Sequence, residues 1–282
     1  MKLVLHLGFH KTASTHLQGI LESVVPEYDG IRYVGPLEFR AKTFWFNPGY
    51  KGLDQKRSEA YLNELSSSSG TVVISDENIC GHSDDIFRHS RFYENLFGRL
   101  QSLSAFSDRF DTTDVWVAIR NSATFIPSIY CEAMRWKGYQ DFSEVFQGDF
   151  NQSWLPVIRD ILDALPNSNI NVICYENYRA SIPQFFDDLG VDTGLFNDQK
   201  SDVVRRSPSW HSIKTYKNIS YFLPLRLQKR LLQFIERFDG PDSEPFAPFS
   251  ELEIKRHNTS YAQDIASIAV EKRVKLVEGN YG

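Results

Sequence analysis

Hydrophobic residues along this chain form short dense runs that alternate with longer segments of helical periodicity. The dense runs are rich in Val, Ile and Leu with little alternation, which is typical of strands covered on both faces. They occupy residues 3–9, 31–35, 71–75, 115–120 and 170–175. Segments with apolar residues on one helical face occupy residues 15–25, 125–136, 154–165, 182–189, 225–238 and 261–277. This alternation predicts an α/β fold with a central, mostly parallel five-stranded sheet flanked by helices and a helical C-terminal portion.

Length and composition are those of a globular protein with a sizeable buried core. The chain has 282 residues, of which 41% are hydrophobic and 24% charged, and its net charge is −5. This composition excludes a disulfide scaffold, and the acidic balance argues against a general nucleic-acid binder. The pattern shows no domain boundary. We therefore predict a single domain over residues 1–282.

Several features of the sequence predict a cytoplasmic protein. No apolar run reaches the length of about 18 residues that a membrane span needs, and the N-terminus lacks the core of a secretory signal. The three cysteines, Cys80, Cys131 and Cys174, lie far apart in the sequence. Their spacing indicates a reducing compartment and shows no metal-ligand pattern.

The first predicted strand continues through the sequence GFHKTASTHLQ directly into a helix. Such a loop points backbone N–H groups and the positive end of a helix dipole at one spot. Lys11 adds a positive charge, and Thr12, Ser14 and Thr15 add hydroxyl groups, so the loop suits a phosphate or a sulfate. The alternative interpretation is a capping box formed by Thr15 and Gln18.

The spacing of this loop favours one kind of anion. A Walker A loop has a second glycine before its lysine, which is missing here and argues against an ATP or GTP hydrolase with Mg²⁺. The sequence HKTASTHLQ instead resembles H-K-T-G-T-T-x-L-Q, the 5′-phosphosulfate loop of bacterial sulfotransferases that use 3′-phosphoadenosine 5′-phosphosulfate (PAPS). The resemblance implies a fold related to the P-loop NTPases. It also implies that the donor is bound by His10, Lys11, Thr12, Ala13, Ser14 and Thr15. Ala13 stands where the family has glycine, and at positive φ it would carry a strain of about 1 kcal/mol or more.

A second motif, VWVAIRNSATFIPSIYCEAMRWKG, includes the fourth predicted strand. In the sulfotransferases an Arg at the end of this strand and a Ser eight residues later bind the 3′-phosphate of PAPS, and Arg120 and Ser128 match that spacing. The end of a parallel strand is also where open α/β sheets bind ligands, and a guanidinium can hold a phosphate through two hydrogen bonds. Pro127 is expected in the first helical turn, which predicts Ser128 near the helix N-terminus. The alternative is an Arg120 that pairs with a carboxylate and a Ser128 that only caps the helix.

Two further segments are assigned less specifically. The resemblance implies that a basic segment closes over the 3′-phosphate and adenine, and Arg205 and Arg206, followed by Ser207, stand at a suitable place. A solvated basic loop is the alternative. The aromatic segment 42–52, KTFWFNPGYKG, could stack on an acceptor or simply pack on the sheet.

The resemblance implies transfer of a sulfuryl group from PAPS to a hydroxyl or an amine, which leaves PAP, the 3′,5′-bisphosphate. Lys11 would neutralise the leaving phosphate, and no metal is expected. Glu77, in the sequence ISDENICGH, is the first candidate for the base, with Asp76 as support and His82 as the alternative. Burial would have to raise the pKa of Glu77 toward neutrality. Otherwise, Asp76 and Glu77 cap a helix that begins near residue 84.

The acceptor is expected to be a carbohydrate or a small hydroxylated metabolite, and the oligomeric state, including a homodimer, is left open. Two other functions are the alternatives to a sulfotransferase. A P-loop nucleotide or small-molecule kinase would require Mg²⁺ and ATP. A non-catalytic module that binds PAPS or PAP is favoured by Ala13, which departs from the family's glycine.

Overall fold

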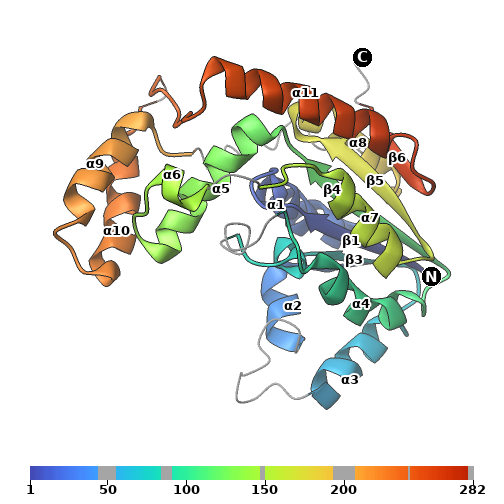
Figure 1. Cartoon of the computed structure of the whole chain (residues 1–282). Coiled ribbons are helices and arrows are strands. Elements are labelled where there is room, and N and C mark those ends of the chain that lie inside the picture. Colours follow the sequence, from blue (N-terminus) through green and yellow to red (C-terminus); the bar gives the residue numbers. More distant parts are fainter. Residues whose placement is uncertain (44–54, 84–90, 147–149, 193–206, 241, 279–282) are drawn as a thin grey trace.

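The structure, a computed structural model, describes residues 1–43, 55–83, 91–146, 150–192, 207–240 and 242–278 (Figure 1). Its centre is a parallel six-stranded sheet with the strand order β2-β3-β1-β4-β5-β6. The strands are β1 (Lys2–Gly8), β2 (Ile31–Val34), β3 (Thr71–Ser75), β4 (Thr112–Ile119), β5 (Ser168–Cys174) and β6 (Val274–Val277). The predicted α/β fold with a parallel sheet is confirmed, and the predicted number of five strands is wrong.

The sixth strand lies inside the segment 261–277, which the periodicity assigns to a helix. That helix, α11 (Glu251–Ile268), begins and ends earlier than predicted. Arg273, with a φ of 66°, then takes the left-handed conformation that usually requires glycine. The chain continues into β6, which pairs with β5 from Val274 to Val277. Because the sequence has no glycine at this turn, it gives no signal that the helix stops.

The order of the strands creates a binding position between β1 and β4. These two strands are neighbours, but β1 connects through α1 (Ser14–Val24) toward β2, on one side of the sheet. The chain after β4 enters α5 (Ser122–Lys137) and continues toward β5, on the other side. Where successive connections leave in opposite directions, an open parallel sheet has a crevice at the carboxyl ends of its strands. The loops that begin with Phe9 and Arg120 therefore border this crevice.

Helices cover both faces of the sheet. Successive strand residues point to opposite sides, and apolar residues on both sides need a covering layer. In β1, Leu3, Leu5 and Leu7 pack into one buried cluster and Val4 into another. The second cluster contains α1 and α8 (Tyr178–Asp187). The first cluster includes residues of α5, α11 and the helices α2 (Pro36–Lys42), α3 (Gln55–Leu65), α4 (Leu96–Ser107) and α7 (Leu155–Ala164).

A helical hairpin extends from one end of the molecule (Figure 1). It consists of α9 (Trp210–Ser220) and α10 (Leu225–Ile235), which pack against the C-terminal half of α5 near the short α6 (Phe142–Val145). A separate small core joins them, formed by Tyr130, Cys131, Met134, Ile213, Tyr216, Leu232, Ile235 and Phe246. Helix α5 thus connects the sheet to the hairpin. In the parts of the chain that the structure describes, no helix is long and apolar enough to cross a membrane.

Candidate functional site

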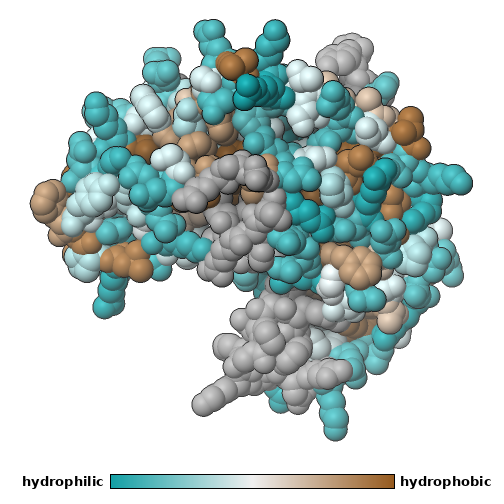
Figure 2. Space-filling view, in the orientation of Figure 1, coloured by the Kyte–Doolittle hydropathy of each residue, from teal (hydrophilic) through white to brown (hydrophobic). Residues whose placement is uncertain are grey.

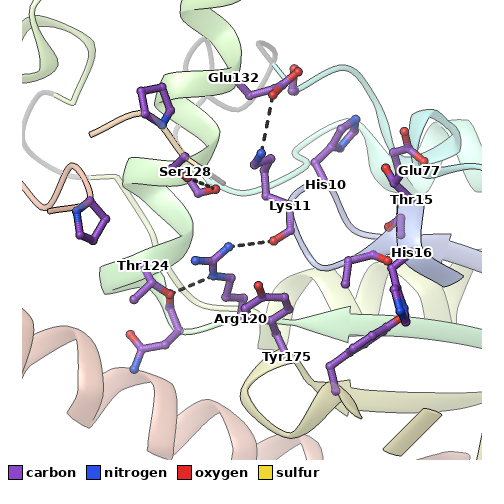
Figure 3. Close-up of a pocket in the computed structure, with 18 of the residues that line it drawn as sticks. His10, Lys11, Thr15, His16, Glu77, Arg120, Thr124, Ser128, Glu132 and Tyr175 are labelled. Atoms are coloured by element: carbon purple, nitrogen blue, oxygen red, sulfur yellow. Dashed lines mark hydrogen bonds and ion pairs between the residues drawn. The ribbon is translucent and has the colours of Figure 1, made fainter. Parts of the chain in front are cut away.

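A cleft of about 2140 Å³ opens where the loops after four of the strands meet. The loop after β1 contributes Lys11, the loop after β3 contributes Glu77, and the loops after β4 and β5 contribute Arg120 and Tyr175. Helix α5, the segment before α9, the end of α10 and parts of α8 and α11 also contribute to the lining. The two predicted anion-binding motifs therefore border a single cleft (Figure 3).

The loop after β1 needs unusual backbone conformations. Gly8, Lys11 and Ala13 have φ values of 88°, 61° and 68°. A Cβ added at Gly8 would lie 2.9 Å from the Cβ of Glu77, so glycine is required there for conformation and for space. Ala13 is the N-cap of α1 in the left-handed region, so the condition under which strain is expected there is met. No side chain caps this helix, so the capping-box interpretation is wrong.

The hydroxyl groups of this loop mostly serve the loop itself. The Oγ1 of Thr12 is buried and donates to the carbonyl of Phe9 at 2.6 Å, and the Oγ of Ser14 donates to the same oxygen at 3.0 Å. Ser14 and the exposed Thr15 line the cleft. The first intrahelical bonds come from the N–H groups of residues 16 and 17, so those of Ser14 and Thr15 have no partner within the helix. Backbone N–H groups thus supply much of the loop's capacity to bind an anion.

His10 lies beside Lys11 but is part of a buried support. Its Nδ1 and its backbone N–H both lie 3.1 Å from the hydroxyl of Tyr93, and its Nε2 lies 3.1 Å from Oδ1 of Asn78. These partners fit one tautomer, in which Nε2 donates to Asn78 and Nδ1 accepts from Tyr93. Burial lowers the pKa of His10, and the charge of Glu77 opposes that shift. With both nitrogens occupied, His10 holds the loop in place.

The ammonium of Lys11 points into the cleft and meets a chain of charges on α5 (Figure 3). Its Nζ lies 3.7 Å from Oε2 of Glu132, which is also paired with Arg135. Arg135 in turn donates to Glu236 at 2.8 Å. Burial lowers the pKa of Lys11, and the charge of Glu132 opposes that shift. Glu132 is not among the residues predicted from the sequence, although its position one helical turn after Ser128 places it on the same face of α5.

Arg120 follows β4 and reaches the loop after β1. Its Nη1 donates to the carbonyl of Lys11 at 2.9 Å, and its Nε donates to Oγ1 of Thr124 at 2.9 Å. The guanidinium carbon lies 4.4 Å from the centre of the Tyr175 ring. Among the described residues, no carboxylate forms an ion pair with Arg120. The alternative in which Arg120 pairs with a carboxylate is therefore not found there. Its remaining N–H groups can therefore serve an anion in the cleft.

Ser128 also lines the cleft, but not at the helix N-terminus. Helix α5 begins at Ser122, capped by the side chain of Asn121, and Pro127 lies inside it. Ser128 is therefore in the second turn, which corrects both the predicted position and the capping alternative. The Oγ of Ser207 donates to the Oγ of Ser128 at 3.0 Å. The candidates Arg205 and Arg206 lie outside the described residues, as does the aromatic segment 44–52.

Glu77, the candidate base, lies at the cleft and is held by two side chains. Its Oε2 accepts from Gln18 at 3.0 Å, and its Oε1 lies 3.5 Å from Arg40. Burial raises the pKa of Glu77, but the charge of His10 and the hydrogen bonds outweigh burial, so the pKa lies below its ordinary value. The raised pKa that a base at this position would need is therefore not found. Gln18 entered the sequence analysis only as a capping residue, and its contact with Glu77 gave no sequence signal.

The neighbours of Glu77 differ in their roles. Asp76 is fully buried, pairs with Arg40 through both carboxylate oxygens, and caps the short 3₁₀ helix Glu77–Cys80 by accepting from the backbone N–H of Asn78 at 2.9 Å. It thus supports the loop and does not face a ligand. His82 is exposed and lines the cleft. The helix expected near residue 84 falls outside the described residues.

The site offers positively charged groups and N–H donors for anions, together with carboxylates, Glu77 among them, that can accept a proton. Among the described residues, no group of three or more His, Cys, Asp or Glu side chains could hold a metal ion. The chain matches no known protein family, and a search among curated proteins finds no relative.

Proposed function

We propose that the chain is a sulfotransferase that moves a sulfuryl group from PAPS to a hydroxyl or amine of an acceptor. One observation carries the proposal: Lys11 and Arg120, from the two motifs, line one cleft and are joined by a 2.9 Å hydrogen bond. Both follow neighbouring parallel strands that border the crevice between β1 and β4. A donor with anionic groups at its two ends suits this pair. The central loop after β1 likewise supports a relation to the P-loop NTPases.

The side chains present fit such a donor. Lys11 and the N–H groups of Ser14 and Thr15, which have no partner within α1, would hold the phosphosulfate. Arg120, together with Ser128, which lines the same cleft, would hold the 3′-phosphate. A cleft of about 2140 Å³ exceeds the range of roughly 300–1,000 Å³ that is usual for one small ligand, so an acceptor would have room beside the donor. We expect a carbohydrate or a small hydroxylated metabolite.

The chemistry needs little covalent help from the protein. A bond forms between the acceptor oxygen and sulfur, the bond from sulfur to the 5′-phosphate oxygen breaks, and the acceptor proton leaves. Lys11 would stabilise the charge on the departing phosphate. Glu77, ionised at neutral pH because its pKa is lowered, would accept the proton, and Gln18 and Arg40 would keep its carboxylate oriented.

A non-catalytic module that binds PAPS or PAP is the second candidate. The lowered pKa makes Glu77 a weak base. The pairing of Lys11 with Glu132 also draws the ammonium toward a protein partner. Both features are compatible with binding that is not followed by turnover.

Thermal unfolding with added nucleotides tests the proposal. At 100 times its dissociation constant a ligand adds about 2.7 kcal/mol to stability, which corresponds to roughly 5–10 °C for a chain of this size. We expect this shift with PAP and without a metal. A shift with Mg-ATP but none with PAP would favour the kinase and contradict the proposal. A shift with PAP but no transfer from radiolabelled PAPS to any of a panel of glycans, phenols and lipids would favour the binding module.

A further inference from the structure

The hairpin of α9 and α10 has a charge opposite to that of the chain as a whole. Residues 210–238 contain one carboxylate, Glu236, and six basic residues, which give a net charge of +5 in a chain with a net charge of −5. The basic residues are Lys214, Lys217, Arg226, Lys229, Arg230 and Arg237. Such a concentration of positive charge attracts an anionic surface.

Helix α10 exposes an apolar stripe beside a basic one. With about 100° per residue, Leu227 and Phe234 project on one side of its outer surface, where they are exposed. The exposed Phe238 follows in the 3₁₀ helix Glu236–Phe238, which continues from α10. The rings of Phe234 and Phe238 lie 5.2 Å apart. Arg226 and Arg230 lie on the adjoining strip and are exposed, and within the described parts of the chain neither pairs with a carboxylate. We call these five residues the α10 face.

The turn between the two helices adds apolar groups at the tip of the hairpin. Phe222 is 85% exposed, and Tyr221 and Leu225 on either side of it are exposed as well. The turn is firmly held, because the side-chain amide of Gln228 donates to the carbonyls of Ser220 and Leu223 at 2.9 Å each. Large apolar side chains are therefore exposed to solvent on an ordered backbone. Exposed apolar groups of this kind are typical of an interaction surface.

The shape of this region favours a membrane over a protein partner. The hairpin projects from the body, and its side chains form a convex end on which apolar and hydrophilic groups lie side by side (Figures 1 and 2). Specific protein interfaces usually bury about 800 Å² on each partner, which a projecting tip does not easily supply. A bilayer surface accepts convex protrusions, and phenylalanine or leucine beside arginine is typical of helices that lie at the lipid headgroups.

We propose that the hairpin docks on the surface of an anionic membrane through the α10 face. Leu227, Phe234 and Phe238 would enter the headgroup region, and Arg226 and Arg230 would contact lipid phosphates. Gln233 and Arg237 of the same segment line the cleft, so docking brings the mouth of the cleft close to the lipid surface. The inference rests on the hairpin alone and does not depend on the proposed activity.

Co-sedimentation of the full chain with vesicles tests the proposal. We expect binding to vesicles of phosphatidylcholine with about a third phosphatidylserine, weaker binding to phosphatidylcholine alone, and a decrease with added salt. The apolar double variant Phe234→Ser/Phe238→Ser should bind at least about tenfold more weakly. Its matched control is Leu37→Ser/Val270→Ser, which changes residues that are 86% and 82% exposed elsewhere. This control should bind like the wild type.

The basic residues are tested in the same assay. Arg226→Gln/Arg230→Gln should weaken binding to anionic vesicles about tenfold or more, whereas Lys255→Gln/Arg256→Gln, at exposed positions on α11, should not. Unchanged unfolding temperatures would show that all variants fold. Absence of wild-type binding, or equal binding by the α10 variants and their controls, would overturn the proposal. A self-associated species that Phe234→Ser/Phe238→Ser dissociates would also overturn it and would assign the face to a second copy of the chain.

Discussion

Arg120, at the end of β4, donates a hydrogen bond of 2.9 Å to the backbone carbonyl of Lys11, in the loop after β1. This bond connects the two motifs that are predicted to bind anions. Arg120 therefore has two roles: it holds the left-handed backbone of Lys11, and it presents its remaining N–H groups to the cleft.

The structural role of Arg120 predicts a loss of stability in Arg120→Ala. The variant loses hydrogen bonds to Lys11 and Thr124 and the contact with Tyr175, so we expect the free energy of unfolding to fall by about 1–3 kcal/mol. Arg159→Ala is the control, because Arg159 is more than half exposed and forms an ion pair with Glu271. Such a pair contributes about 1 kcal/mol or less. Equal losses in urea unfolding would show that the bond to Lys11 does not stabilise the loop.

Glu132 is predicted to weaken the binding of anions. Glu132→Gln removes the negative charge 3.7 Å from Lys11, while Arg135 keeps Glu236 as its partner. We expect PAP to bind about three- to tenfold more tightly at low ionic strength, measured by titration calorimetry. Glu64→Gln, at an exposed position on α3, should leave the affinity unchanged. Weaker PAP binding in Glu132→Gln would mean that Glu132 serves to position Lys11 for the ligand.

The lowered pKa of Glu77 predicts where activity is lost on the acid side. In the proposed mechanism the carboxylate is the active form, so kcat/KM should stay level down to the lowered pKa and fall below it, at a pH under the ordinary value near 4.5. Gln18→Ala removes one donor to Glu77 and should raise this pKa, which moves the acid limb to higher pH with little change at neutral pH. An acid limb that does not move would exclude Gln18 as a positioning residue.

The lowered pKa of Glu77 also predicts how the stability of the fold depends on pH. Because the folded-state pKa of Glu77 is lowered, its ionised form stabilises the fold above the unfolded-state pKa, and this contribution disappears as the pH falls through the folded-state pKa. Glu77→Gln should therefore be less stable than the wild type at neutral pH, and the difference should shrink in acid. Full transfer activity in Glu77→Gln would assign the base to His82.

The strain at Ala13 predicts a stabilising substitution. Ala13 has a φ of 68°, which glycine adopts at no steric cost, so Ala13→Gly should raise the free energy of unfolding by about 0.5–1 kcal/mol. Ala105→Gly, at an exposed position inside α4, should lower it by about 1 kcal/mol. If both variants lose stability to the same degree in urea unfolding, Ala13 is not strained.

The elements around the site could be predicted because their signals are local. The apolar strand before Lys11 and the helix after it are continuous in sequence, and the carboxyl ends of parallel strands meet at one edge of a sheet. For this reason Lys11 and Arg120 could be expected in one cleft. Their supports could not, because they come from distant residues: His10 meets Tyr93 at a separation of 83 residues, and Gln18 meets Glu77 at a separation of 59.

Local detail also limits what a sequence reveals. From the sequence, the hydroxyl of Thr12 is predicted to face an anion. In the structure the backbone is left-handed at Lys11 and Ala13, and the hydroxyl of Thr12 donates to the carbonyl of Phe9 instead. Helix α5 continues through Pro127 although proline usually ends or kinks a helix, and this moves Ser128 away from the N-terminus. Tertiary packing decides both features.

Titration calorimetry with PAP and AMP tests the central claim, since only PAP carries a 3′-phosphate. We predict that the wild type binds PAP at least about tenfold more tightly than AMP, that Arg120→Ala brings this ratio close to one, and that Lys11→Ala weakens both ligands while keeping the ratio. A wild type that binds neither ligand, or an unchanged ratio in Arg120→Ala, would contradict a cleft in which the two motifs hold opposite ends of one donor.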